Sequence, residues 1–276
     1  MEENRKQNQG KRGKKRNAAS NIVLGIAVAV FFFSAYKLIS IYSEYHQGDK
    51  EYDGIAEVAI EFQTSEDNEE AKGESEQTLK VHTSLKVDFE RLKQTNKDVV
   101  AWIQFDEPER INYPVVKGAD NDQYLKTTFE GKQNSAGTIF MDTVNAGDFS
   151  DHNTFIYGHN MKNGSMFGQL RKFKTKDYYE QNPYFYIYTP DGKEVQYQIF
   201  AVCIVEDTSR SYTRFYNSDE EYLDYLKYVQ SIARYDTGVE LTAESKIVSL
   251  STCTNVSETQ RLLVHGVKIG ETVVGE

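Results

Sequence analysis

The sequence predicts a mainly β domain with a closed or nearly closed sheet and peripheral helices, preceded by one membrane-spanning helix. Two observations carry this prediction: eight short runs rich in β-branched and aromatic residues follow residue 98, and an uncharged twenty-residue stretch lies near the N-terminus. The chain has 276 residues, of which 39% are hydrophobic and 13% aromatic, enough for a sizeable core. Its two cysteines are too few for a disulfide scaffold or a thiolate zinc cluster.

The N-terminal region joins a basic tip to an apolar stretch. Residues 1–16 contain seven Lys and Arg residues, and Asn17 to Tyr36 carry no charge. Twenty residues is a membrane-spanning length, and apolar residues continue beyond Tyr36 without a clean Ala-x-Ala cleavage site. We therefore expect an uncleaved anchor over residues 17–43, rather than a cleaved signal peptide or a buried core helix. The positive-inside rule keeps residues 1–16 in the cytoplasm and places the chain after about Tyr42 outside the cell membrane.

The remainder of the chain is acidic. After residue 20 it holds 25 basic and 40 acidic residues, which argues against nucleic-acid binding. Glu44 to Glu76 alone contain twelve acidic residues against Lys50 and Lys72. We interpret residues 44–78 as a solvated extracytoplasmic linker that does not pack, and residues 79–276 as the folded domain.

The folded domain begins with a short helix and continues mainly as strands. Leu85, Phe89 and Leu92 have helical spacing behind a possible Ser84 cap, so we expect a helix that ends near Asn96. Eight strands are expected after it, at Val99 to Phe105, Tyr113 to Lys117, Gly137 to Met141, Thr154 to Tyr157, Tyr184 to Tyr188, Glu194 to Val205, Lys246 to Thr252 and Leu262 to Ile269.

Two of the segments that connect the expected strands contain sequence patterns that predict their structure. The segment TPDGKE predicts a tight hairpin, with Asp191 and Gly192 at the positions of positive φ. Ser218 to Glu221 form a capping-box pattern, and apolar residues follow it at three- and four-residue spacing. We therefore expect a helix over roughly Asp219 to Arg234, inside a forty-residue connection between strands.

Cys253 is the leading candidate for chemistry. It ends the apolar run KIVSLSTC, and a thiol at a strand terminus is presented to a cleft rather than sealed in a core. Cys203 lies within the apolar run QIFAVCIV, where packing is its expected role. Two non-catalytic roles are the alternatives for Cys253: a half-buried small residue, or one end of a Cys203–Cys253 disulfide.

A catalytic thiol needs a proton partner and a donor to the oxyanion. His159 follows a strand in TFIYGHNMKNGSMF and is the leading acid or base, while His46 and His82 fall in the linker region. His265 is an alternative candidate for the acid or base, because it shares one face of the last strand with Arg261. Arg261 follows Cys253 by eight residues across a polar turn, so two adjacent strands could bring them together; its alternative is a surface ion pair.

Taken together, TFIYGHNM, LSTCT and QRLLVHGVKI resemble the sortases, the membrane-anchored cysteine transpeptidases of Gram-positive bacteria. GTIFMD and the two expected helices point more narrowly to class B. The resemblance covers about Leu85 to Ile269 and implies a sortase-type eight-stranded closed β-barrel. It assigns Cys253 as nucleophile, His159 as acid/base and Arg261 as the oxyanion-side arginine, and leaves His265 a structural role. The peptide groove would be lined by Asn121, Leu125, Tyr157, Ser251 and Thr252, whereas Thr254 stands where some relatives have an acidic residue.

The resemblance also implies a reaction and its partners. The enzyme would cleave a C-terminal sorting motif of a secreted surface protein after Thr, form a thioester, and pass the acyl group to an amine of the peptidoglycan precursor. The motif would be of an Asn-Pro-x-Thr or related type, and no metal or organic cofactor is implied. Three alternatives stay open: a cysteine endopeptidase that mainly hydrolyses, a pilin-polymerising sortase, and a non-enzymatic membrane-tethered binding module.

Overall fold

The computed structural model describes residues 2–62, 82–254 and 256–274. The chain divides into two compact units, Met1–Gln47 and Gly48–Glu276. The first unit is part of one long helix. The second contains the end of that helix and the β-rich domain, and it holds every site residue that the sequence predicts.

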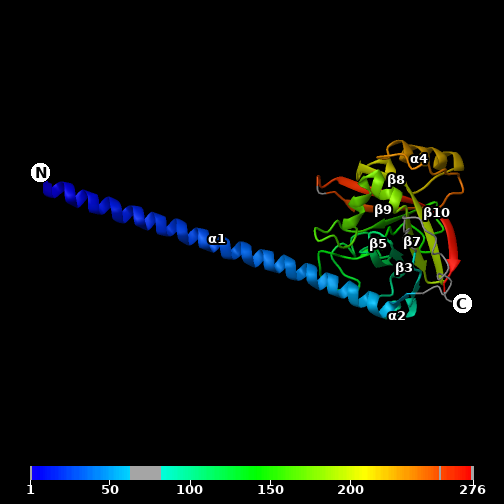
Figure 1. The fold of residues 1–276 in the computed structure, drawn as a ribbon, viewed down its shortest axis with the longest axis horizontal. Helices are drawn as coiled ribbons and strands as arrows, with labels where there is room; N and C mark the ends of the chain where they lie inside the picture. The colour runs from blue at the N-terminus through cyan, green and yellow to red at the C-terminus, as the bar shows by residue number, and fades with distance from the viewer. Residues whose placement is uncertain (1, 63–81, 255, 275–276) are drawn as a thin grey trace, which may run out of the picture. The chain divides into compact units, whose positions relative to one another are not determined.

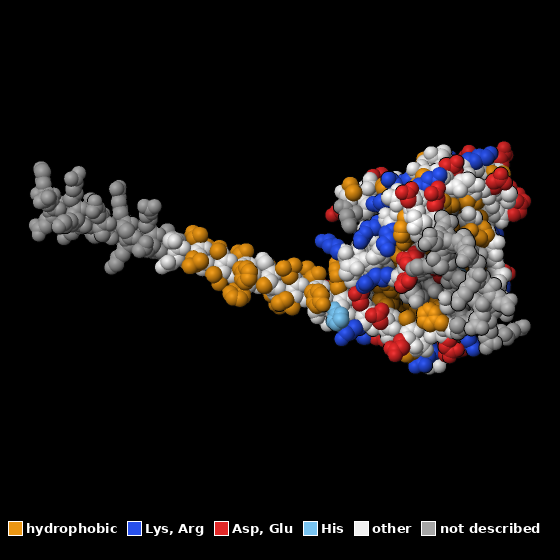
Figure 2. Space-filling view, viewed as in Figure 1, with side chains coloured by type: hydrophobic (Ala, Val, Ile, Leu, Met, Phe, Trp, Pro, Cys, Tyr) orange, Lys and Arg blue, Asp and Glu red, His pale blue; other side chains and the backbone are white. Residues whose placement is uncertain are grey.

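Helix α1 (Glu2–Ala59) contains an apolar stretch long enough to cross a membrane, within Ser20–Ala59. Its large hydrophobic side chains are exposed, including Ile22, Phe31 and Phe33, and Figure 2 shows such side chains along the described part of the helix. An apolar helical stretch of this length with exposed side chains is consistent with a membrane anchor.

The last turns of α1 pack within the second unit, where the sequence predicted a solvated linker. Tyr52, Ile55 and Ala59 are buried, and their spacing puts them on one helix face. Strand β1 (Ile60–Phe62) then pairs antiparallel with β2 (Leu85–Val87). The expectation of an unpacked spacer is therefore wrong for residues 48–62, because the many acidic residues obscured a narrow apolar stripe. The rest of the predicted linker, residues 63–78, lies outside the described residues.

Helix α2 (Phe89–Thr95) starts later than the spacing predicted. Leu85 is buried in β2, and the helix is capped by Asp88, whose Oδ1 accepts a hydrogen bond from Arg91 N at 2.9 Å. Ser84 is therefore not the cap. Strand pairing with β1 takes Leu85 to Val87 out of the helix, although these residues have helical spacing with Phe89 and Leu92.

Eight strands close into a barrel in the order β10-β8-β7-β3-β4-β5-β6-β9, with β9 also pairing with β10. The pairs β4–β5 and β6–β9 are parallel and the others antiparallel, so the barrel is mixed. This architecture confirms the predicted fold class. The strands are β3 (Val99–Gln104), β4 (Asn112–Val116), β5 (Ile139–Met141), β6 (Asn153–Tyr157), β7 (Tyr184–Thr189), β8 (Lys193–Glu206), β9 (Ile247–Cys253) and β10 (Gln260–Val273).

The hairpin between β7 and β8 forms as the segment TPDGKE predicted, with one difference. Gly192 has φ of 80° and its N–H donates to Thr189 O at 3.0 Å, but Asp191 keeps a negative φ. Pro190 favours negative φ at the start of the turn, so glycine alone supplies the left-handed residue.

Helix α4 (Asp219–Ser231) lies in the connection between β8 and β9, three residues shorter than predicted. Ser218 Oγ accepts from Glu221 N, while the Glu221 carboxylate accepts from the Asn217 N–H rather than from Ser218. Buried aromatic and aliphatic residues of α4 pack over β8, and Figure 1 shows the helix beside that strand. The other short helices are η2 (Gly168–Lys174), α3 (Lys176–Gln181) and η3 (Arg210–Tyr212).

Candidate active site

The two cysteines occupy opposite environments. Cys253 is the last residue of β9 and is exposed, while its backbone C=O accepts from Asn160 Nδ2 at 2.9 Å. Cys203 is fully buried on β8 beneath α4, and this burial raises the pKa of its thiol to about 12. Both thiols are free, so no Cys203–Cys253 disulfide joins β8 to β9. Only Cys253 is placed to meet a substrate.

His159 reaches the same edge of the barrel because β6 runs parallel to β9. Tyr157, the last residue of β6, is the register partner of Ser251. His159 follows Tyr157 by two residues in the loop after β6, and Cys253 follows Ser251 by two residues at the end of β9. The ring Nε2 of His159 lies 2.7 Å from Leu125 O. The preceding Gly158 packs closely against Ile139 and Phe167, since a Cβ there would lie 2.4 Å from Ile139 Cδ1 and 2.8 Å from Phe167 Cδ2.

Arg261 is brought to Cys253 by the antiparallel β9–β10 ladder, in which the two residues are register partners. Side chains of directly opposed residues leave a sheet on the same face. The guanidinium donates to Glu258 O and forms an ion pair with Asp207 at 3.3 Å. The surface ion pair considered as the alternative is therefore present, but Arg261 also lines the cavity described next.

All eight predicted site residues line one cavity of about 240 Å³. It combines an exposed thiol, an imidazole and a guanidinium with apolar and hydroxyl-bearing walls. Phe140 and Gly158 also line it and were not singled out from the sequence. The predicted residues in its wall are Asn121, Leu125, Tyr157, His159, Ser251, Thr252, Cys253 and Arg261.

A buried carboxylate that sequence reasoning missed organises one wall of this cavity. Asp142 has no exposed side-chain surface, and its Oδ2 accepts from Tyr157 Oη at 2.7 Å and from Arg214 Nε at 2.7 Å. Its Oδ1 accepts from Asn121 Nδ2 at 3.1 Å. Burial disfavours the charged carboxylate, yet the hydrogen bonds from Tyr157 and Asn121 hold the pKa of Asp142 below its usual value.

Arg214 supports the same wall from the connection between β8 and α4. Its Nη2 donates to Tyr157 Oη at 3.1 Å, and its guanidinium lies over the Phe155 ring, 5.5 Å from the centroid. From the same connection, Tyr212 Oη lies 2.7 Å from Ser251 Oγ. The long connection therefore holds two cavity-lining residues through hydrogen bonds, although no motif in it signalled this role.

His265 is a buried structural residue. Its Nδ1 lies 2.8 Å from Ser249 Oγ, and it does not line the Cys253 cavity. Burial lowers the pKa of its ring to about 3, so the imidazole stays neutral at physiological pH. A neutral, enclosed imidazole cannot exchange protons with a substrate at the barrel edge.

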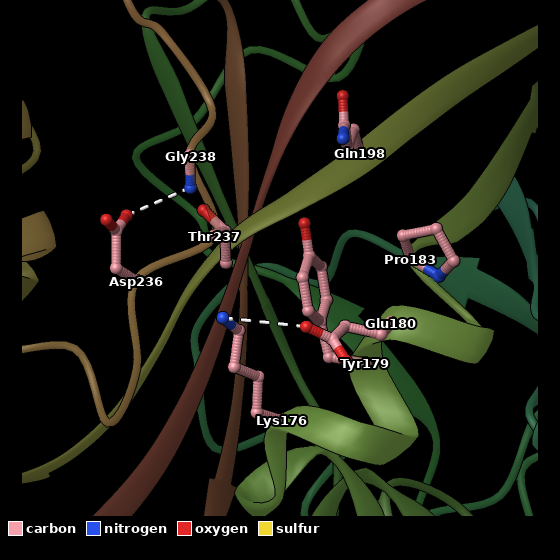
Figure 3. Close-up of a pocket in the computed structure, with 8 residues that line it drawn as sticks. All are labelled: Lys176, Tyr179, Glu180, Pro183, Gln198, Asp236, Thr237 and Gly238. Atoms are coloured by element: carbon pink, nitrogen blue, oxygen red, sulfur yellow. Dashed lines mark hydrogen bonds and ion pairs between the residues drawn. The ribbon is translucent and has the colours of Figure 1, made fainter.

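A second cavity, of about 440 Å³, lies at α3 and the segment 236–238 and holds neither a thiol nor an imidazole among its lining residues. Figure 3 shows its charged side chains paired within the cavity: Lys176 with Glu180 at 3.5 Å, and Asp236 with Gly238 N at 2.9 Å. Within the described part of the chain, no group of three or more His, Cys, Asp or Glu side chains could hold a metal ion.

Comparisons with known proteins agree with this architecture. The sortase domain family matches residues 105–269. Sortase B of Listeria monocytogenes is 32% identical over 247 residues, which cover 87% of this chain and 93% of that protein. The crystal structure of Bacillus anthracis sortase B in complex with AAEK1 has a TM-score of 0.67 at 30% identity, covering 83% of this chain and 99% of that one. The Staphylococcus aureus sortase B–substrate complex has a TM-score of 0.61 at 31% identity, covering 66% of this chain and 84% of that one. The chain therefore belongs to the sortase family, as a sortase B-like cysteine transpeptidase.

Proposed function

We propose that this transpeptidase cleaves a C-terminal sorting motif of a secreted surface protein after Thr and joins the new carboxyl end to an amine of the peptidoglycan precursor. One observation carries the proposal: a thiol, an imidazole and a guanidinium meet in one cavity, where Cys253, His159 and Arg261 come from adjacent elements of the barrel. These groups are what acyl transfer through a thioester requires.

In the first step, the Cys253 thiolate attacks the carbonyl carbon of the Thr residue. The C–N bond of the scissile peptide breaks, a thioester forms, and His159 gives a proton to the leaving amine. The guanidinium of Arg261 donates hydrogen bonds to the oxygen on which negative charge develops. Arg261 lies opposite Cys253 in the β9–β10 ladder, which supports this role.

In the second step, the acceptor amine attacks the thioester carbon and the Cys253 thiolate leaves. His159 accepts the proton that the amine loses, so the enzyme returns to its starting state. A thioester reacts readily with amines, and a cavity that limits water near the acyl carbon favours transfer over hydrolysis. The reaction uses no metal or organic cofactor.

The walls of the cavity support a role in peptide binding. We assign Asn121, Leu125, Tyr157, Ser251 and Thr252 to the groove, because all five line the cavity that contains the thiol. An Asn-Pro-x-Thr or related motif is the expected substrate. One solved relative, sortase B of Staphylococcus aureus, is a substrate complex.

The cellular arrangement follows from the N-terminal sequence. Residues 1–16 form a basic cytoplasmic tip, residues 17–43 a single-pass anchor, and the compact unit Gly48–Glu276 an extracytoplasmic catalytic domain. The basic tip before an uncharged stretch supports this orientation. External protease should reach the domain in intact cells, whereas a cytoplasmic domain would be protected.

Mass spectrometry of the products formed by the full chain in detergent tests the proposed reaction. The protein is incubated with a mixed library of sorting peptides and triglycine. A peptide cut after Thr and joined to triglycine is expected. Cleaved peptide without ligation would indicate a hydrolase, and transfer only to a lysine-containing pilin peptide would indicate a polymerising sortase. A chain that neither cleaves nor ligates, and whose Cys253 labels no faster than a free thiol, would indicate a binding module.

A further inference from the structure

The end of helix α1 contacts the loop that holds the acceptor of the His159 ring. Tyr52 is 4% exposed, and its Oη donates to Gly137 O at 2.5 Å and lies 3.2 Å from Thr138 Oγ1. Phe129 N donates to the same hydroxyl at 3.3 Å. One buried hydroxyl therefore connects three points of the loop 124–138.

Gly137, which accepts the hydrogen bond of Tyr52, packs directly against the backbone of Leu125. It has φ of 57°, and a Cβ there would lie 2.4 Å from Tyr124 O and 2.8 Å from Leu125 O, so the two parts of the loop pack backbone to backbone. Thr138 N also donates to Tyr124 O at 3.0 Å. The Leu125 carbonyl is the group that lies 2.7 Å from His159 Nε2. A short path thus runs from Tyr52 through Gly137 and Leu125 to the imidazole.

The same helix also contacts the loop that carries His159 itself. Asp49 accepts from Asn163 Nδ2, with its two carboxylate oxygens at 3.3 and 3.1 Å, and pairs with Arg110 Nη2 at 2.7 Å. Asn163 Oδ1 in turn accepts from Ser165 N at 3.2 Å, within the turn that follows His159. Asp49 therefore connects the helix to the second of the two loops that position the His159 ring.

A third contact lies between these two on the helix. Glu51 accepts from Glu130 N at 3.0 Å and pairs with Lys132 at 3.4 Å, both in the loop 124–138. The exposed face of the helix, by contrast, carries Glu57. Three neighbouring positions of the helix, Asp49, Glu51 and Tyr52, thus contact the two loops.

We propose that Tyr52 and Asp49 are positioning residues for His159, so that the segment between the apolar stretch and the barrel is part of the catalytic apparatus rather than a spacer. The inference rests on the proposed acid/base role of His159. The helix holds both the loop that supplies the ring and the loop that supplies its hydrogen-bond partner. An imidazole displaced by about 1 Å would transfer protons more slowly.

Steady-state kinetics of the full chain in detergent test this inference with Tyr52→Phe, which removes only the hydroxyl. The matched control is Tyr222→Phe, which removes a hydroxyl bonded to His152 O and Ser245 O beneath α4. Both variants should lose a few degrees of thermal stability. Tyr52→Phe should lower kcat ~10-fold with KM for the peptide changed less than twofold, while Tyr222→Phe keeps the wild-type kcat. Equal kcat values for the two variants would overturn the inference.

Asp49 provides a second test at a less buried position. Asp49→Ala should lower kcat several-fold, whereas Asp49→Asn, which keeps an acceptor for Asn163, should retain most activity. Glu57→Ala on the same helix is the control and should match wild type. Asp49→Ala with wild-type kcat would count against the inference. His159→Ala separates the two proposals: if it stays active, the assigned role of His159 fails, whereas if it is inactive and both helix variants are normal, only the positioning inference fails.

Discussion

Arg261 and Cys253 are directly opposed in the β9–β10 ladder, so the guanidinium and the thiol leave the barrel on the same face. The Arg261 guanidinium is held at the rim by Asp207 at 3.3 Å and by the Glu258 carbonyl. An ion pair at this exposure is worth about 0 to 1 kcal/mol. The arginine can therefore turn toward a substrate oxygen at little energetic cost.

We predict that Arg261→Lys and Arg261→Ala each lower kcat/KM at least ~100-fold, about 2.7 kcal/mol of transition-state stabilisation. Lysine keeps the charge but loses the planar pair of donors. Thermal unfolding should change little, because the ion pair to Asp207 is solvated. The measurement is ligation kinetics beside thermal unfolding for the three proteins. A lysine variant with wild-type kinetics would reduce the requirement to charge alone.

The two thiols should differ in reactivity. In the native protein at pH 8, iodoacetamide should label Cys253 and leave Cys203 unmodified, because burial raises the pKa of Cys203 to about 12 and excludes the reagent. Cys203→Ala should cost about 1 kcal/mol of stability and keep most activity. Peptide mapping after labelling gives the result, and comparable labelling of both thiols would contradict the assignment.

Arg214 should affect substrate binding more than chemistry. Replacing it with Met removes a donor to Asp142 and to Tyr157, so the wall formed by Tyr157 and Asn121 loses its support. We expect KM for the sorting peptide to rise roughly 5- to 10-fold, and the free energy of unfolding to fall by about 1 to 3 kcal/mol, because the buried Asp142 carboxylate loses a partner. Arg210→Met is the control, since that arginine pairs with Asp224 at an exposed site. An unchanged KM for Arg214→Met would exclude the role.

The contacts of the His82 ring lead us to expect that the stability of the protein depends on pH. The sequence placed His82 in the linker region, but its Nδ1 lies 2.7 Å from Asp106 and its Nε2 3.3 Å from Glu194. Burial opposes protonation, but these hydrogen bonds prevail and raise the pKa of His82 to about 9. Its stabilising effect is therefore complete below about pH 6.5, the unfolded value, and is lost as pH rises through 9.

Denaturant unfolding of wild type and His82→Gln between pH 6 and pH 10 tests this dependence. The difference in free energy of unfolding should be largest near pH 6 and should shrink toward pH 10. Curves that stay parallel over this range would show that the ring titrates alike in both states.

The sequence predicted the barrel well because its strands are short runs with few competing patterns. The interval of eight residues across a polar turn predicted that Arg261 could lie beside Cys253, whereas His159 was joined to this pair by the resemblance to the sortases. The prediction was wrong for Leu85, whose spacing with Phe89 and Leu92 indicated a helix but which lies in β2, paired with β1. Local pattern cannot reveal a partner strand that lies some twenty-five residues away.

Long-range polar contacts were also beyond the sequence. Asp142 and Arg214 are 72 residues apart, and Tyr52 and Gly137 are 85 apart, with no motif that links either pair. Acidic composition predicted a solvated segment around Tyr52, yet three apolar residues on one helix face sufficed to bury it. Average composition therefore concealed the contact on which the positioning of His159 depends.

Trapping the acyl-enzyme tests the central claim most directly. The full chain is mixed with a cleavable sorting peptide in the absence of an acceptor amine, quenched in acid, and digested for mass spectrometry. We predict a thioester adduct of the peptide fragment ending in Thr on Cys253, which triglycine discharges as ligated product, and no adduct in Cys253→Ala. An acyl group on any other residue, or continued ligation by Cys253→Ala, would contradict the account.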